Sequence, residues 1–265
     1  MPAVGFGTSR LRGKECERSV AAALNAGFRM IDTAIAYGNE RSIGRAIRMS
    51  GLPRESIFVT SKLLGSEGYA DGIGAVHGSL ERLGMDYLDL YLMHLPIDGS
   101  LAGTWQAMQT AWQSGLVRAI GVSNFSIDQL QVLGDLGGEL PTVNQIELNP
   151  WRRQLAIQSF CRNANIQIVA WAPLMHGTPL REVSAISEIA ERRRKSVAQI
   201  ILRWHLQSNL VPIPSTSSFE HMKQNLDIFD FVLDDSEMNS IDILDSSSDS
   251  NPHQILLTPR SFASG

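Results

Sequence analysis

The sequence repeats one pattern along most of its length: a short run rich in apolar and β-branched residues, then a turn, then a segment with helical periodicity. Such a run occurs eight times, at residues 3–7, 29–32, 57–62, 88–94, 119–123, 142–147, 166–172 and 210–214. Alternating strands and helices indicate a parallel sheet, because parallel strands need a crossover connection. Eight strands that each feed a helix favour an α/β fold of the closed (β/α)8 TIM barrel type over an open sheet.

The segments between these runs predict the helices. Residues 16–27 and 71–84 are amphipathic, and each ends at a glycine, Gly27 or Gly84, that suits the left-handed conformation of a C-cap. Two further helical segments are expected between the last two strands, at residues 183–195 and 196–209.

Length and composition agree with one such barrel. The chain has 265 residues, and barrels of this type form single domains of about 250 residues. No linker interrupts the pattern, so we expect one domain over residues 1–265, ending in a polar loop and C-terminal tail at residues 245–265. The formal charge of −4 and the apolar content of 43% give no electrostatic footprint for a nucleic-acid partner.

The sequence shows no feature of a membrane or secreted protein. No run of 18 or more apolar residues occurs and the N-terminus lacks a signal-peptide pattern, so we expect a cytoplasmic protein without a membrane partner. The basic run at residues 191–195, ERRRK, is interpreted as the solvated end of a helix. Cys16 and Cys161 are too few for a disulfide framework and are expected to be passive thiols.

Two glycine-containing segments match nucleotide-binding loops only in part. Residues 72–78, GIGAVHG, carry His77 at the position of the third glycine and follow no strand. Residues 7–15, GTSRLRGKE, have a glycine spacing one residue too long, and Glu15 stands where a P-loop has a hydroxyl. A nucleotide that binds this chain is therefore expected to use neither type of glycine-rich loop.

Chemically active side chains stand at the ends of three successive predicted strands. These are Asp32, with Tyr37 in the loop that follows, then Lys62, then His94. Each alone has an ordinary structural interpretation: a helix N-cap, a half-buried aromatic, a surface cation or a hydrogen-bonded structural histidine. Because catalytic residues of such barrels lie at the C-terminal ends of the strands, the four together are expected to meet at one site.

This set suits the reduction of a carbonyl group to an alcohol. Hydride must reach the carbonyl carbon and a proton its oxygen, so the site needs an acid with a pKa nearer neutrality than the ~10 of free tyrosine. Lys62, held in place by Asp32, is expected to lower the pKa of Tyr37, and His94 would orient the carbonyl. No histidine pair has metal-ligand spacing, so no metal is expected.

The chain resembles the aldo-keto reductase family over nearly its whole length, and most of all its shorter bacterial members of the 2,5-diketo-D-gluconate reductase type. The motifs are GFRMIDTAIAYGNE, SLERLGMDYLDLYLMHLP, AIGVSNF, VNQIELNP, AWAPL and NLDIFDF, in the family's order. The resemblance implies a barrel that reduces aldehydes or ketones with hydride from a nicotinamide cofactor bound across its C-terminal face. It makes Tyr37 the general acid, tuned by Lys62 and Asp32, with His94 positioning the carbonyl.

The same resemblance assigns the cofactor contacts. Ser123, Asn124 and Gln145 match positions that hydrogen-bond the carboxamide, and Trp171 matches the aromatic residue that stacks on the nicotinamide. Residues 212–229 match the segment around the adenosine half, where a helix N-terminus suits a phosphate. The other implied positions are Thr8, Asp32, Pro173, Leu174, Ser215, Thr216, His221, Gln224 and Asn225. Without the resemblance, a tryptophan at a strand end would be interpreted as core and VSN as a helix-initiating turn.

The sequence departs from the family at the substrate pocket and at the N-terminus. Ser9, Leu64 and Leu95 stand where many members have aromatic residues, which predicts a roomier pocket. Relatives usually carry a β-hairpin that plugs the bottom of the barrel, and here that hairpin is expected to be reduced or missing.

The cofactor segment also departs from the family. Ser215 and His221 replace the lysine and arginine that commonly bind the 2′-phosphate of NADPH, so the cofactor is expected to be NADPH, NADH or both, with a relaxed NADPH preference. Lys223 and Arg181 are alternative cations that could reach the phosphate.

The sequence leaves two alternatives to a reductase that acts on a small-molecule carbonyl substrate. One is a cofactor-binding regulator or sensor on the same fold, as in channel-associated β subunits of this family. The other is a barrel hydrolase, for which no nucleophile or metal site is evident. Nothing in the sequence requires more than a monomer, and substrate specificity is expected to lie in the loops.

Overall fold

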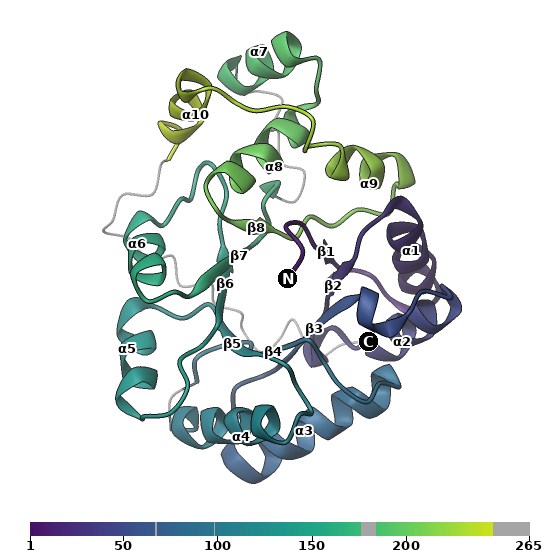
Figure 1. Ribbon diagram of the computed structural model, residues 1–265, viewed down its shortest axis with the longest axis vertical. Helices are drawn as coiled ribbons and strands as arrows, with labels where there is room; N and C mark the ends of the chain where they lie inside the picture. Colours follow the sequence, from purple (N-terminus) through teal and green to yellow (C-terminus); the bar gives the residue numbers. More distant parts are fainter. Residues whose placement is uncertain (67, 98, 176–183, 246–265) are drawn as a thin grey trace.

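The computed structural model describes residues 1–66, 68–97, 99–175 and 184–245. Eight parallel strands in sequence order form one sheet that curls into a barrel, and helices surround it (Figure 1). The strands are β1 (Phe6–Gly7), β2 (Met30–Asp32), β3 (Phe58–Leu63), β4 (Leu90–Met93), β5 (Ile120–Ser123), β6 (Val143–Glu147), β7 (Gln167–Trp171) and β8 (Val211–Pro212). The predicted fold class and all eight predicted strands are confirmed, although most strands are shorter than expected.

The barrel closes where β1 meets β8. The N–H of Gly5 donates to Pro212 O and the N–H of Gly7 donates to Pro214 O, both at 3.0 Å. The two prolines have no N–H, so they return no hydrogen bond to β1. A Cβ atom on Gly7 would lie 2.9 Å from Ile213 O, so the close approach of the two strands requires a glycine at this position.

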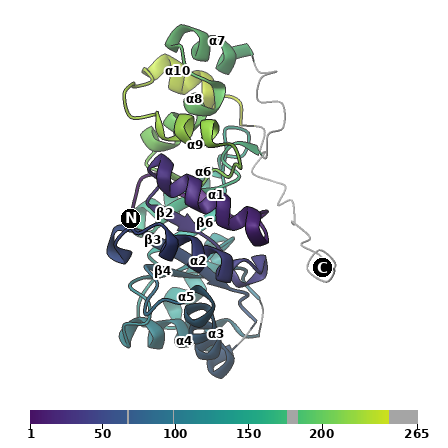
Figure 2. The ribbon, with the colours of Figure 1, turned by 90° about the vertical axis from the view of Figure 1, so that its right-hand side faces the viewer.

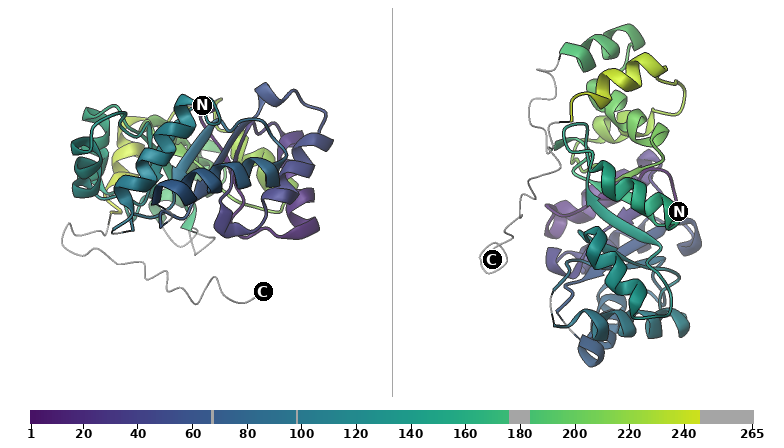
Figure 3. Two further views of the ribbon diagram at one scale, coloured as in Figure 1. Left: turned by 90° about the horizontal axis from the view of Figure 1, so that it is seen from below. Right: turned by 90° about the vertical axis from the view of Figure 1, so that its left-hand side faces the viewer.

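The helices form a ring around the sheet. They are α1 (Gly13–Ala26), α2 (Glu40–Met49), α3 (Gly68–Leu83), α4 (Leu101–Gln113), α5 (Ile127–Asp135), α6 (Leu155–Asn163), α7 (Ser184–Arg193), α8 (Val197–Gln207), α9 (Phe219–Leu226) and α10 (Asp235–Asp242), with short 3-10 turns η1 (Ile35–Tyr37) and η2 (Arg54–Ser56). The helices α7 to α10 gather at one end of the molecule, and α3, α4 and α5 lie at the other (Figures 2 and 3).

The helix predictions are confirmed where the structure describes them. Gly27 and Gly84 have φ values of 115° and 65°, so both have the left-handed conformation that a C-cap glycine provides. The two helices expected between the last two strands are α7 and α8. Ser196 caps α8 in a capping box, which explains why the chain starts a new helix there.

Strand side chains alternate between two apolar layers. In β4, Leu90 and Leu92 belong to a small buried cluster with Met30, Val143, Val169, Val211 and Ile213. Tyr91 and Met93 belong instead to the large cluster shared with the surrounding helices. This period of two is the period of a β-strand. The small cluster fills the barrel interior, so a ligand can enter only at the mouth of the barrel.

Residues 1–5 precede β1 and form no strand, so these described residues contain no plug hairpin. Most of the predicted C-terminal tail, from residue 246 onward, lies outside the described residues. Within the described ranges, no helix is long and apolar enough to cross a membrane.

Candidate active site

A cavity of about 1300 Å³ opens at the C-terminal ends of the strands, where active sites of such barrels lie. Its wall includes Asp32, Tyr37 and His94 of the predicted catalytic set. It also includes every residue that the sequence assigns to the cofactor: Thr8, Asp32, Ser123, Asn124, Gln145, Trp171, Pro173, Leu174, Ser215, Thr216, His221, Gln224 and Asn225. Common small-molecule sites have volumes of about 300–1,000 Å³, so this cavity is larger than most and has room for a long ligand.

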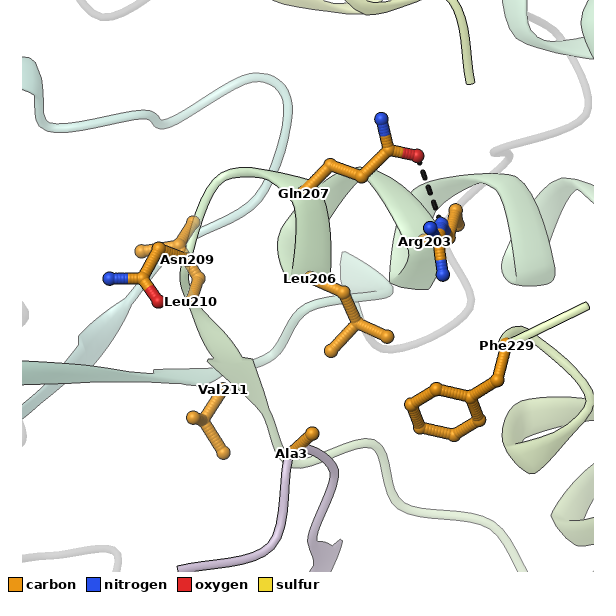
Figure 4. A pocket seen from close by; sticks show the side chains of 8 residues that line it. All are labelled: Ala3, Arg203, Leu206, Gln207, Asn209, Leu210, Val211 and Phe229. Atoms are coloured by element: carbon orange, nitrogen blue, oxygen red, sulfur yellow. Dashed lines mark hydrogen bonds between the residues drawn. The ribbon is translucent and has the colours of Figure 1, made fainter. Parts of the chain in front are cut away.

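A second cavity, of about 280 Å³, lies at the opposite end of β8 (Figure 4). Ala3, Leu206 and Phe229 contribute to its wall, and the side chain of Arg203 is held by a 2.9 Å hydrogen bond from its Nε to Gln207 Oε1. The wall offers no acid, base or nucleophile. The larger cavity is therefore the candidate site.

Asp32 and Lys62 form a buried ion pair at the base of this cavity. Lys62 Nζ lies 2.6 Å from Asp32 Oδ1 and donates a second hydrogen bond to Thr33 O at 2.8 Å. The parallel register explains the contact, since Asp32 pairs with Thr60 and Lys62 lies two residues further along the same face of β3. Burial, the largest single effect, lowers the pKa of Lys62, but the charges of Asp32 and Tyr37 and the hydrogen bonds with both residues together raise it by more. The net pKa is therefore raised and the ammonium stays charged.

The second oxygen of Asp32 also has a partner. Gln145, on β6, donates from Nε2 to Asp32 Oδ2 at 2.7 Å. Lys62 is 0% exposed and Asp32 only 2%. The alternative interpretations of a surface lysine and a helix N-cap are therefore wrong, and the N-cap of the next α-helix is Asn39.

Tyr37 is the last residue of η1, and Gly38 follows it in the left-handed region with φ 63°. Lys62 Nζ lies 5.2 Å from the centre of the Tyr37 ring. Burial raises the pKa of Tyr37, and the charge of Lys62, which lowers it, does not offset burial. The prediction that the pKa of Tyr37 is lowered is wrong in its net direction. Burial costs the phenolate more hydration energy than its attraction to the Lys62 ammonium restores. The phenol therefore keeps its proton at neutral pH.

His94 follows β4 directly and faces Tyr37. The two rings are 5.7 Å apart between centres and meet edge to face at 83°. Burial, with a smaller contribution from the charge of Lys62, lowers the pKa of His94 to about 3, so the imidazole is neutral at neutral pH. Its Nδ1 is buried and has no hydrogen-bond partner among the described residues. The alternative of a fully hydrogen-bonded structural histidine is therefore wrong.

A polar network holds the residues expected at the nicotinamide. Asn124 has a φ of 63°, and its Nδ2 donates to His94 O at 3.1 Å. Its Oδ1 accepts from Trp171 Nε1 at 2.9 Å, so the indole is half-buried in the cavity wall with its edge fixed. Ser123 Oγ donates to Gln145 O at 2.8 Å. The side chains of Ser123, Asn124 and Trp171, at the ends of β5 and β7, are thus held in place by neighbouring residues.

The residues expected at the adenosine half lie on the loop after β8 and on α9. Ser218 caps α9, and its Oγ accepts from the N–H of His221 at 3.3 Å. Thr216 Oγ1 accepts from the N–H of Ser218 at 3.1 Å. The cap therefore occupies one of the helix amides that the sequence analysis expected to suit a phosphate.

The three residues predicted to line the substrate pocket do not all lie in the cavity wall. Ser9 lies in the cavity wall, whereas Leu64 and Leu95 do not. The N–H of Leu95 donates to Leu64 O at 3.2 Å, so these two leucines lie beside each other past the ends of β3 and β4.

The sequence analysis missed cavity residues at Arg10 and at the junction of α7 and α8, where Glu191, Arg194 and Lys195 lie in the wall. Residues 191–195 had been interpreted as a solvated helix end, and for Lys195, only 12% exposed, this is wrong. Topology could have indicated the junction, because a helix that precedes a barrel strand begins at the C-terminal face.

Comparison with known proteins gives a consistent result. A model of the "Aldo/keto reductase family" matches residues 3–246. Glyoxal reductase from Bacillus subtilis is 42% identical over 260 residues, which cover 97% of this chain and 94% of the relative. The uncharacterized oxidoreductase YtbE from the same organism is 41% identical over 250 residues, covering 92% of this chain and 89% of the relative.

Solved structures are similar over the same length. MGS-M4, an aldo-keto reductase enzyme from a Medee basin deep-sea metagenome library, superposes with a TM-score of 0.90, at 40% identity and 92% coverage of both chains. An aldo-keto reductase from Bombyx mori in complex with NADP has a TM-score of 0.83 at 32% identity, covering 92% of this chain and 89% of that one.

Proposed function

This chain belongs to the aldo/keto reductase family, and we propose that it reduces aldehydes or ketones to alcohols with hydride from NADPH or NADH, with Tyr37 as the proton donor. The observation that carries the proposal is the buried ion pair of Lys62 and Asp32 beside Tyr37, at a cavity wide enough for a dinucleotide and a small substrate. A protonated phenol next to a fixed ammonium is what proton transfer to a carbonyl oxygen requires.

When bound, the nicotinamide supplies hydride to the carbonyl carbon. Tyr37 gives its proton to the carbonyl oxygen, so the C=O group becomes CH–OH and a phenolate remains on the protein. Lys62 stabilises that phenolate with a charge that is already in position, so no reorganisation is needed as the proton leaves. Tyr37 then regains a proton from water.

His94 would hold the carbonyl. A neutral imidazole has one N–H and one nitrogen without a proton. His94 can therefore donate a hydrogen bond to the carbonyl oxygen while Tyr37 remains the group that transfers a proton to it. Its place in the cavity wall, with its ring against that of Tyr37, supports a ligand-binding role.

Gln145 and its neighbours would hold the carboxamide. The Nε2 of Gln145 donates to Asp32, so its Oε1 is the end that can accept a hydrogen bond from the carboxamide NH2. Trp171 is fixed at its indole nitrogen by Asn124, so the indole face can pack on the nicotinamide.

The cofactor is proposed to be NADP(H) with a relaxed preference over NAD(H). The complex of the Bombyx mori relative with NADP supports the first part. Ser215 and His221 support the second, because neither is a permanent cation beside the expected 2′-phosphate. Ser215→Lys combined with His221→Arg should tighten NADPH binding tenfold or more, about 1.4 kcal/mol.

The test is to follow oxidation of NADPH and NADH with a panel of carbonyl compounds. Small aldehydes, bulky ketones and glyoxal belong in the panel, glyoxal because of the name of one relative. We expect NADPH-dependent reduction of at least one class, abolished in Tyr37→Phe. Tight cofactor binding with no turnover on the whole panel would favour the sensor alternative, which no observation above supports.

A further inference from the structure

The junction of α7 and α8 carries four successive cations that have different surroundings. Three of them are ion-paired: Arg192 with Glu237 at 3.6 Å, Arg193 with Glu237 at 2.6 Å, and Lys195 with both Asp227 and Asp230 at 2.8 Å. Arg194 has no ion pair and no side-chain hydrogen bond with any residue in the described ranges. The residue is exposed, so water rather than a carboxylate balances its charge, and it lies in the wall of the large cavity.

The backbone of Arg194 is also unusual. Its φ is 55°, in the left-handed region, where a non-glycine residue costs on the order of 1 kcal/mol or more. Its N–H donates to Glu191 O at 3.1 Å to close the turn, and a glycine could make the same bond without strain. The turn itself thus gives no reason for a long cationic side chain at this position.

Arg194 shares the cavity wall with the residues expected at the adenosine half of the cofactor. Its neighbour Lys195 is 2.8 Å from Asp227, the C-cap residue of α9, so the junction of α7 and α8 lies beside the C-terminal end of α9. The helices α8 and α9 are adjacent in Figure 1. The same wall contains Ser215 and His221, the two positions expected near the 2′-phosphate.

We infer that Arg194 binds the 2′-phosphate of NADPH and is the source of whatever preference this chain has for NADPH over NADH. The inference rests on the proposed function for its choice of ligand. Arginine stays charged at every relevant pH and binds phosphate oxygens in pairs, which neither Ser215 nor His221 can do. A dianion brought next to an unpaired guanidinium also gains attraction without displacing an existing carboxylate partner.

Other cations fit the role less well. Lys195 is committed to two aspartates, and Lys223 lies outside the cavity wall with its Nζ 4.8 Å from the centre of the Phe219 ring. Arg181, the other cation suggested by the sequence, lies outside the described residues. Arg10 lies in the wall on the loop after β1 and is the strongest competitor.

The test is a binding measurement that does not depend on turnover. Arg194→Gly removes the charge and relieves the left-handed strain, so this variant should fold at least as well as the unmodified protein. We expect it to weaken NADPH and adenosine 2′,5′-bisphosphate about tenfold by titration calorimetry, with NADH and AMP within twofold. Arg194→Lys should recover part of the loss. Arg192→Ala, which removes a cation two residues away that is paired with Glu237, should leave every Kd unchanged.

Three results would overturn the inference: unchanged NADPH affinity in Arg194→Gly, equal weakening of NADPH and NADH, or a selective loss of NADPH in Arg10→Ala instead. Failure of the proposed function is recognised separately. It would appear as absence of carbonyl reduction by the unmodified protein, whereas the dependence of NADPH binding on Arg194 is measured without a substrate.

Discussion

Gln145 donates a 2.7 Å hydrogen bond from Nε2 to Oδ2 of Asp32, whose other oxygen holds the ammonium of Lys62. The two residues are 113 positions apart in the sequence, and both are buried. The bond connects a residue proposed to contact the nicotinamide with the ion pair that places a charge beside Tyr37. A substitution at Gln145 should therefore affect proton transfer as well as cofactor binding.

Gln145→Met removes the donor and keeps the approximate volume of the side chain. It leaves a buried carboxylate oxygen without its partner, which costs about 1–3 kcal/mol. We expect kcat at saturating cofactor to fall at least about tenfold, together with a lower Tm. A raised Kd for cofactor with an unchanged kcat would show that Gln145 acts on the cofactor alone. Gln145→Glu, which puts a second carboxylate beside Asp32, should be more damaging still.

Tyr37→Phe should lower kcat about 10²-fold or more, because general acid catalysis typically contributes 10²–10⁴. The ring remains, so its edge-to-face contact with His94 is kept and cofactor affinity should change little. Steady-state rates and a cofactor titration on the same preparation check both parts. Turnover close to that of the unmodified protein would contradict the assignment of Tyr37 as the acid.

Lys62→Met should be comparably inactive and also unstable. It leaves the carboxylate of Asp32 buried without its cation, a change that typically costs about 3–5 kcal/mol. Urea unfolding measures the loss. The double substitution Lys62→Met with Asp32→Asn removes both charges, so it should regain stability without regaining activity. A double variant no more stable than Lys62→Met would mean that the unpaired charge is not the cause.

Stability should fall in acid partly because of His94. Burial lowers its pKa to about 3, while an unfolded histidine has a pKa of about 6.5. Between these values the unfolded chain binds more protons, so this residue removes up to about 1.4 kcal/mol per pH unit as the pH falls below about 6.5. His94→Gln should give a shallower loss between pH 6 and 4 in urea unfolding. Burial also lowers the pKa of His205, but this residue is present in both the unmodified protein and His94→Gln. Its contribution therefore cancels when the two slopes of stability against pH are compared. Equal slopes would contradict the prediction.

Ser9→Trp should narrow the substrate pocket. Ser9 lies in the cavity wall, so an indole there would occupy space open to bulky ketones. We expect kcat/KM for branched ketones to fall about tenfold while small aldehydes are little affected. Leu95→Trp is a matched control, because Leu95 lies outside that wall and the same side chain there should have a smaller effect. An unmodified protein that reduces small aldehydes but no bulky ketone would contradict the roomy pocket.

The fold was predictable because each strand and helix has a local signal and the strand count determines the closure of the barrel. The same regularity brought Asp32, Lys62 and His94 to one end, since residues at the C-terminal ends of parallel strands meet at one face. The positions assigned to the cofactor came from family resemblance, and all of them line one cavity. Their chemical roles are proposals that the experiments above test.

Other features could not be predicted because they depend on contacts between distant residues. The pKa of Tyr37 depends on how deeply the phenol is buried relative to its distance from Lys62, and a sequence gives neither quantity. Within the basic run at residues 191–195, Lys195 is less exposed than a solvated helix end predicts, because its acidic partners Asp227 and Asp230 come from another part of the chain. Charge patterning within one segment cannot show which of several cations remains unpaired.

Pro212 in β8 and Pro214 just after it leave the junction of the first and last strands with fewer hydrogen bonds than a full parallel pair. Among the described residues, the amide protons of Gly5 and Gly7 make the backbone hydrogen bonds across this junction, so their exchange with deuterated solvent would report separation of the first and last strands independently of the other seven junctions. The loops that carry Ser9 and Ser215 leave the barrel on either side of the same junction. A breathing motion there would widen the entrance used by a long ligand while the catalytic ion pair, held by β2 and β3, stays intact.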